Sequence, residues 1–306
     1  MNKNGLYKEL ERWLVQFKKN SIKASSYNTT MSTLKLLGRY SISEIEPENI
    51  TTDDIQKLMN ALVNDRYSME TITKVYKLIG EYLDYCLYLG RITRAVHKGV
   101  RRPSESTVLK KKRNIVAYNE DEQARLYKVL ESSSNPCYQA ALLMLETGMR
   151  VGEVMALCWS DIDWRRRSVH INKTTIRCKQ RQADYIQHQP KTMSSIRTIA
   201  LSSRAQALLR KVIGDTNIGF IFHDEDDEPL RYDCMKYWIR KACEEANVTY
   251  YGQHVFRHTF ATNCYYKGCD VKLLSRMLGH ANVTTTYNMY IHLYGDALED
   301  MRAIVE

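Results

Sequence analysis

A helical repeat of apolar side chains between residues 6 and 89 constrains the fold more than any other feature of the chain. Apolar residues recur every three or four positions, as at Leu10, Trp13, Leu14 and Phe17 and again at Val75, Leu78, Ile79, Tyr82 and Leu83, which is the spacing of one helix face. Polar residues that favour helix starts precede three of the expected helices, at Ser25–Ser26, Thr51–Asp54 and Ser68. We therefore predict a domain of four or five helices over residues 1–97.

The repeat is lost between Lys98 and Arg113, where seven basic residues stand against one acidic residue and a proline interrupts the chain. This composition predicts a basic linker over residues 98–114. Two interpretations of it remain open: a solvated tether, or a strap that lies along a nucleic-acid backbone and releases counterions from it.

The pattern after the linker is mixed. Helical runs at 120–131 and 138–147 are followed by strand-like stretches at 168–171 and 197–201, and the helical period returns after residue 202. We predict a second domain over residues 115–306. The fold class expected for the whole chain is therefore mainly α with a small antiparallel β-sheet, in two domains.

Charge and cysteine usage limit the functions that need considering. The 306 residues carry 45 Lys and Arg against 35 Asp and Glu, so the net charge of +10 favours a polyanionic partner. The eight cysteines include no CxxC pair, which argues against a zinc or redox site. The amino terminus has no signal-peptide core, and no apolar run approaches the ~18 residues that a membrane span needs. We expect a cytoplasmic protein with reduced thiols and no membrane association.

Two short stretches place charged donors on shared helix faces. Arg150 and Glu153 are three residues apart, as are His254 and Arg257, and His258 lies close to the second face. A surface ion pair, which contributes only ~0–1 kcal/mol, is the plain alternative for the first pair. Paired guanidinium groups can instead stabilise phosphoryl transfer without a metal ion, with a tyrosine as the nucleophile.

Four motifs together carry a resemblance to a known family. TGMRVGE followed by LCWSDID, then PKTMSSIRTIAL, HVFRHTFAT and LGHANVTTTYNMYIH occur in the order and approximate spacing of the tyrosine recombinases, which include the phage integrases. The resemblance is close over residues 115–295 and looser over the helical domain, which looks like a core-DNA-binding domain. It implies a site-specific DNA recombinase that cleaves and rejoins strands through a 3′-phosphotyrosine, with no cofactor and neither metal nor ATP.

The resemblance also implies roles for individual residues. Arg150 and Arg257 match the clamps on the scissile phosphate, and His254 and His280 match further hydrogen-bond donors or proton carriers. Glu153 matches the family's acidic position, where it would brace the clamp. His258 is given no catalytic role.

Two further roles concern a general acid and the nucleophile. Lys191 matches the β-hairpin lysine that protonates the leaving 5′ oxygen, with Lys173 and Lys179 as weaker candidates. Tyr290 matches the nucleophile by its Tyr-x-His context and its distance from the LGH motif, and Tyr287 is its competitor.

The family also implies double-stranded DNA recombination sites as partners, a homotetramer in the synaptic complex, and accessory directionality or DNA-bending proteins. The expected backbone contacts of the linker are Lys110, Lys111, Lys112 and Arg113. The carboxyl-terminal residues 293–306 are amphipathic, and two docking sites are open to them, a neighbouring protomer or their own domain. Two alternatives to recombination remain: DNA relaxation of the type IB topoisomerase kind, and a DNA-binding regulator without catalysis.

Overall fold

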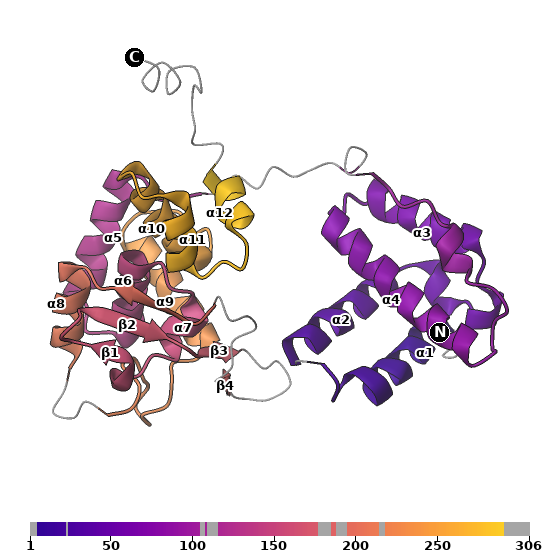
Figure 1. Cartoon of the computed structure of the whole chain (residues 1–306), viewed down its shortest axis with the longest axis horizontal. Coiled ribbons are helices and arrows are strands. Elements are labelled where there is room, and N and C mark those ends of the chain that lie inside the picture. Colours follow the sequence, from indigo (N-terminus) through magenta and orange to yellow (C-terminus); the bar gives the residue numbers. More distant parts are fainter. Residues whose placement is uncertain are drawn as a thin grey trace, which may run out of the picture. The chain divides into compact units, whose positions relative to one another are not determined.

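The computed structural model describes residues 5–22, 24–104, 108, 116–176, 185–187, 195–213 and 218–290. The chain forms two compact units, residues 1–113 and residues 114–306 (Figure 1). The described part is mainly helical with a small antiparallel sheet, which confirms the predicted fold class. None of the described helices is long and apolar enough to cross a membrane.

The regular structure of the first unit, over its described residues, is helical. They are α1 (Leu6–Trp13), the π-helical turn η1 (Leu14–Lys18), α2 (Ala24–Leu37), the 3₁₀ turns η2 (Ser41–Glu44) and η3 (Pro47–Asn49), α3 (Thr52–Asn64), α4 (Met69–Tyr88) and the 3₁₀ turn η4 (Val96–Gly99). The apolar repeat of the sequence forms their common core, in which Leu10, Leu14 and Leu83 are fully buried. Trp13 packs edge-on against Tyr82 of α4, with ring centroids 5.7 Å apart.

Two of the three predicted helix starts are confirmed. Thr51 caps α3 in a reciprocal pair, because it accepts from the Asp54 amide at 3.2 Å and its own amide donates to the Asp54 carboxylate at 2.9 Å. Ser68 caps α4. The start predicted at Ser25–Ser26 was wrong, because α2 begins at Ala24 and contains both serines. Further along α2, the hydroxyl groups of Thr30 and Thr33 donate to carbonyls one turn back.

The helical unit extends past residue 97, where we predicted its boundary. The side-chain amide of Gln56 in α3 bonds both the amide and the carbonyl of Arg101, at 2.9 and 3.1 Å. Val100 and Val108 are buried in the core of the same unit. The start of the basic segment therefore packs onto the helices, because these two valines remove apolar surface from water. Lys110, Lys111, Lys112 and Arg113 lie outside the described residues.

The second unit is built around one buried helix. Its helices are α5 (Glu120–Ser132), α6 (Pro136–Thr147), α7 (Val151–Met155), the 3₁₀ turn η5 (Trp159–Asp161), α8 (Ser203–Val212), α9 (Tyr232–Glu245), α10 (His254–Tyr266), α11 (Val271–Leu278) and α12 (Val283–Tyr290). Helix α6 packs against α5, α8, α9 and α10 (Figure 1). Residues all around α6 are buried, as expected for a helix without a polar face.

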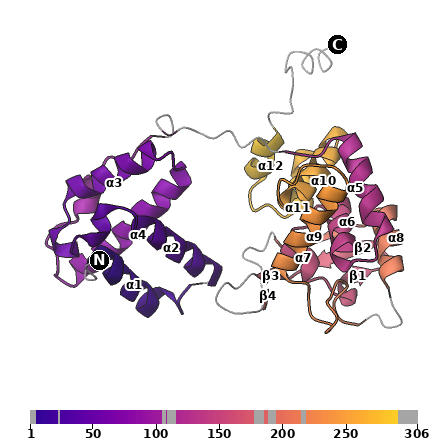
Figure 2. The same ribbon diagram turned by 180° about the vertical axis from the view of Figure 1, so that it is seen from behind.

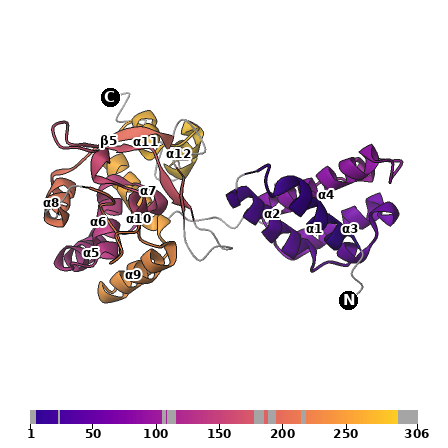
Figure 3. The same ribbon diagram turned by 90° about the horizontal axis from the view of Figure 1, so that it is seen from below.

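The described part of this unit also contains five short strands. They are β1 (Ile162–Asp163), β2 (Ser168–Ile171), β3 (Thr174–Ile176), β4 (Tyr185–Gln187) and β5 (Arg197–Ala200). The antiparallel sheet has the order β1-β2-β5, and β3 pairs with β4 as a separate hairpin. Helix α11 packs against β5, the edge strand of the sheet (Figure 3), and also contacts α10 and α12, which lie beside it in Figure 2.

Candidate active site

Arg150 and Glu153 are brought together by a turn that follows α6. Gly148 ends α6 in the left-handed conformation, with φ +65°, and Arg150 then takes the position just before the first turn of α7. The Glu153 carboxylate accepts from the Arg150 amide and from Arg150 Nη1, both at 2.8 Å. Only 5% of Glu153 is exposed, so the alternative of a surface ion pair is wrong.

Arg197 also binds Glu153, and the sequence analysis missed it. Its Nη1 and Nη2 donate to the two carboxylate oxygens of Glu153 at 3.0 and 2.8 Å, and its Nε donates to the Met277 carbonyl at 2.6 Å. A usable signal was present, because alternation along the strand puts residues 197 and 199 on the buried face of β5. A charged residue at a buried strand position requires a buried partner.

Arg257 projects from α10 and joins two chain segments that are far apart in sequence. Its Nη1 donates to the Gly148 carbonyl at 2.9 Å, and its Nη2 donates to the Leu278 carbonyl. Only 4% of Arg257 is exposed. The guanidinium thus fixes the turn before Arg150 against the end of α11.

His280 lies at that same end. Gly279 stops α11 in the left-handed conformation, with φ +66°, and its carbonyl accepts from Arg150 Nη2 at 3.1 Å. Nδ1 of His280 is 2.7 Å from Oγ1 of Thr286, a fully buried residue of α12. This hydroxyl orients the imidazole, because the role of one ring nitrogen decides the role of the other.

The surroundings lower the pKa values of His254 and His280, which favours their neutral forms. Burial, followed by the positive charges of Arg257, Arg150 and Arg197, lowers the pKa of His280 to about 4. His254 is exposed, but desolvation by the groups around it, followed by the charges of Arg257 and Arg150, also lowers its pKa. A neutral imidazole has one donor and one acceptor nitrogen, so it can accept a proton or donate a hydrogen bond.

Lowered pKa values favour the neutral form of His258 and the ionised form of Glu153. Burial, then the neighbouring His254 and Arg257, lowers the pKa of His258 to about 4. Burial alone would raise the pKa of Glu153, but the hydrogen bonds and charge of Arg197, together with the charge of Arg150, lower it to about 2. The arginine cluster, formed by Arg150, Arg197, Arg257 and Glu153, therefore contains one ionised carboxylate among three guanidinium groups.

The nucleophile candidates lie on α12. Tyr290 is the last residue of this helix, and its side chain lies outside the described residues. Tyr287 is 46% exposed, whereas Thr286, one position earlier, is buried against His280. Helix α12 thus joins the tyrosines to the arginine cluster through the His280–Thr286 contact.

Several predicted residues fall elsewhere. Lys191 and Lys179 lie outside the described residues, as does the tail over 293–306. Lys173 is held in a largely buried ion pair, with its Nζ 2.7 Å from Oδ1 of Asp161, so its ammonium group already has a carboxylate partner.

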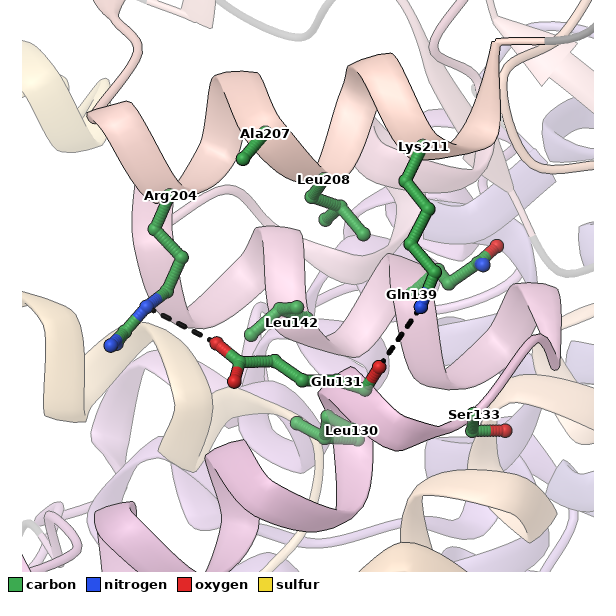
Figure 4. Close-up of a pocket in the computed structure, with 9 residues that line it drawn as sticks. All are labelled: Leu130, Glu131, Ser133, Gln139, Leu142, Arg204, Ala207, Leu208 and Lys211. Carbon is green, nitrogen blue, oxygen red and sulfur yellow. Dashed lines mark hydrogen bonds and ion pairs between the residues drawn. The ribbon is translucent and has the colours of Figure 1, made fainter.

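No group of three or more His, Cys, Asp and Glu side chains within the described ranges is arranged to hold a metal ion. A small pocket of about 170 Å³ lies apart from these residues, with an apolar lining of Leu130, Leu142 and Leu208 (Figure 4). The two cations at its rim, Arg204 and Lys211, are bound to the carboxylate and the carbonyl of Glu131. The pocket shares no residue with the arginine cluster.

Comparison with known proteins places this cluster in a family. The phage integrase family matches residues 117–296, which include the described cluster. A tyrosine recombinase XerC-like protein of Caldanaerobacter subterraneus is 26% identical over 266 residues, covering 80% of this chain and 68% of that protein. The integrase of a Staphylococcus phage is 24% identical over 317 residues, covering 93% of this chain and 87% of its own length.

Solved structures agree on the fold. The Tn1549 transposon integrase in complex with a circular intermediate DNA matches with a TM-score of 0.78 at 17% identity, covering 99% of this chain and 100% of that one. A lambda integrase tetramer bound to a Holliday junction matches with a TM-score of 0.65 at 19% identity, covering 94% of this chain and 78% of that one. With the family matched over most of the second unit, the chain belongs to the phage integrase family of tyrosine recombinases.

Proposed function

We propose that this site-specific recombinase of mobile elements cleaves and rejoins double-stranded DNA through a 3′-phosphotyrosine formed on Tyr290. The observation that carries the proposal is the joining of Arg150, Arg257 and His280 by two backbone carbonyls, those of Gly148 and Gly279. Positive charge is thereby preorganised next to the helix that bears Tyr290.

In the proposed reaction the Tyr290 hydroxyl loses its proton and attacks the scissile phosphorus. A new bond forms between the tyrosine oxygen and phosphorus, and the bond from phosphorus to the 5′ oxygen breaks. A free tyrosine has a pKa of ~10, so a neutral imidazole of His254 or His280 would accept the proton. Lys191 would donate a proton to the leaving 5′ oxygen.

The guanidinium groups of Arg150 and Arg257 would stabilise the charge that develops on the non-bridging oxygens. They supply the electrostatic stabilisation that a metal ion supplies in other phosphoryl-transfer sites, so the reaction should need none. The phosphotyrosine conserves the energy of the phosphodiester, so resealing by a 5′ hydroxyl of a partner strand should need no ATP. Exchange between two duplexes requires four such sites, which supports a homotetramer on DNA.

The first unit would serve as the core-DNA-binding domain and the second as the catalytic domain, with further proteins setting direction. We expect Lys110, Lys111, Lys112 and Arg113 to contact phosphates without reading bases. Replacing all four by glutamine should weaken binding to specific and random DNA alike. The slope of log K against log salt should flatten by about 0.9 for each phosphate that is no longer neutralised. An unchanged slope would show that this segment is a solvated tether.

The test of the proposed function is a suicide substrate nicked beside the cleavage point. Wild-type protein should form a covalent DNA adduct in excess EDTA without nucleotide, and the Tyr290→Phe variant should bind DNA but form none. Tyr287→Phe is the matched control and should keep the adduct. Loss of the adduct in Tyr287→Phe, with retention in Tyr290→Phe, would show that Tyr287 is the nucleophile. Relaxation of supercoils without strand exchange would favour the topoisomerase alternative, and binding without any adduct the silent regulator.

A further inference from the structure

The buried ion pair between Arg197 and Glu153 carries an inference about how the clamp is kept in place. Arg197 meets Glu153 as a fork, with one nitrogen on each carboxylate oxygen. Arg150 touches the same carboxylate through the side-chain nitrogen Nη1 alone, while its Nη2 turns to the Gly279 carbonyl. The strongest geometry for a guanidinium and a carboxylate is thus used by Arg197 rather than by Arg150.

Arg150 and Arg197 differ in how much of their side chains is exposed. The Arg150 side chain is 34% exposed, whereas that of Arg197 is 6% exposed and that of Glu153 5%. A DNA phosphate that approaches the surface can therefore meet Arg150. The guanidinium nitrogens of Arg197 are instead bonded to Glu153 and to the Met277 carbonyl.

The negative charge of Glu153 affects the position of Arg150. A buried, ionised carboxylate attracts any guanidinium within reach, and the attraction is strong where water is excluded. Without Arg197, Arg150 would be the remaining cation bonded to Glu153 among the described residues. It would then be drawn onto both carboxylate oxygens and away from the surface.

A second contact holds Arg197 in this position. Its Nε donates at 2.6 Å to the carbonyl of Met277, which lies in the last turn of α11. Carbonyls of the last helical turn have no partner within the helix, so this one is available to a side chain. The contact joins β5 to α11, which lie side by side in Figure 3, and it fixes the guanidinium through a third nitrogen.

We propose that Arg197 is a positioning residue for strand cleavage, which neutralises Glu153 so that Arg150 stays directed toward the scissile phosphate. The proposal rests on the proposed function. It makes Arg197 act through Glu153, so its effect must depend on the negative charge of that residue.

The test compares Glu153→Gln, Arg197→Gln and the double variant in single-turnover cleavage of the suicide substrate. Arg197→Gln should slow cleavage by about 10- to 100-fold, as expected when a catalytic group is misplaced by about an ångström. DNA affinity should change by less than about threefold, because the three guanidinium nitrogens of Arg197 are already bonded to Glu153 and to the Met277 carbonyl. Arg166→Gln removes the same charge from an exposed turn and should cleave like wild type.

The decisive comparison is the double variant against Glu153→Gln, which can be made even where Arg197→Gln alone does not fold. Once the carboxylate is neutral, removal of Arg197 should slow cleavage by less than about fivefold, a non-additive result that a separate structural role would not give. A double variant more than tenfold slower than Glu153→Gln would overturn the proposal. Absence of an adduct from the wild-type protein would refute the proposed function instead, so the two failures are distinguishable.

Discussion

Replacement of Gly148 by alanine tests how tightly the turn before Arg150 is built. Gly148 has φ +65°, a conformation that costs an L-residue about 1–2 kcal/mol. A Cβ at this position would lie 2.4 Å from Cδ1 and 2.9 Å from Cε1 of Phe260. Forcing an extra methyl group into a packed interior typically costs about 1–3 kcal/mol more. We therefore expect Gly148→Ala to lower the free energy of unfolding by about 2–5 kcal/mol.

Gly268 offers a matched control in the same unit. It has φ +79°, but a Cβ there would meet nothing within 4 Å. Gly268→Ala should lower the free energy of unfolding by only about 1–2 kcal/mol, so the difference between the variants isolates the contact with Phe260. Urea unfolding followed by tryptophan fluorescence is a suitable assay, because Trp159, Trp164 and Trp238 all belong to the second unit.

The same substitution should affect the chemistry. The Gly148 carbonyl accepts from Arg257 Nη1, so a turn that shifts to relieve the contact displaces that guanidinium. We expect Gly148→Ala to slow cleavage of the suicide substrate by about 10- to 100-fold and Gly268→Ala to leave it near wild type. Equal losses of stability in the two variants, within about 0.5 kcal/mol, would refute the reasoning, since such a result would mean that Phe260 yields without cost.

Three other predictions concern the cluster. Arg257→Ala should slow cleavage by about 10²–10³ with a much smaller loss of DNA affinity, and equal losses of rate and affinity would reduce Arg257 to a DNA contact. Thr286→Val removes the hydroxyl that orients His280 and should slow cleavage by about tenfold or more, whereas Thr286→Ser should keep most of the rate; similar rates in both would contradict this role. The folded pKa of Glu153, about 2 against an ordinary 4.5, means that its stabilisation is complete above pH 4.5 and is lost as the pH falls toward 2. His280 adds to the acid loss below about pH 6.5, because its lowered pKa lets the unfolded chain bind the proton first. The urea concentration at the unfolding midpoint should therefore fall less between pH 7 and pH 3 in Glu153→Gln than in the wild type. An equal fall in both proteins would contradict the lowered pKa of Glu153.

Local chemistry explains why much of the fold was predictable. The apolar period in residues 6–89 specifies helices whatever they pack against, and Thr51 and Ser68 mark helix starts by bonds within one turn. The alternation at 168–171 and 197–201 likewise predicted strands, and β2 and β5 form there, with β5 ending at Ala200. Ser25–Ser26 misled, because serine also occurs inside the first turn of a helix, so its presence alone does not mark the cap.

The sequence by itself determined the order of elements, the basic character of the chain and the three-residue spacing of Arg150 and Glu153. The two residues pair because Arg150 occupies the N-cap position of α7, and not on a shared helix face as predicted. Only the tertiary structure decided that Glu153 is buried and that its main partner is Arg197, 44 positions away. The same holds for the Gly148 carbonyl bound by Arg257 and for the partly buried contact between His280 and Thr286. Burial and long-range hydrogen bonds depend on which surfaces meet after the elements form, and no periodicity along the chain encodes that meeting. The charge states of the site follow from it, because desolvation and neighbouring guanidinium groups set the pKa values of its carboxylate and its histidines.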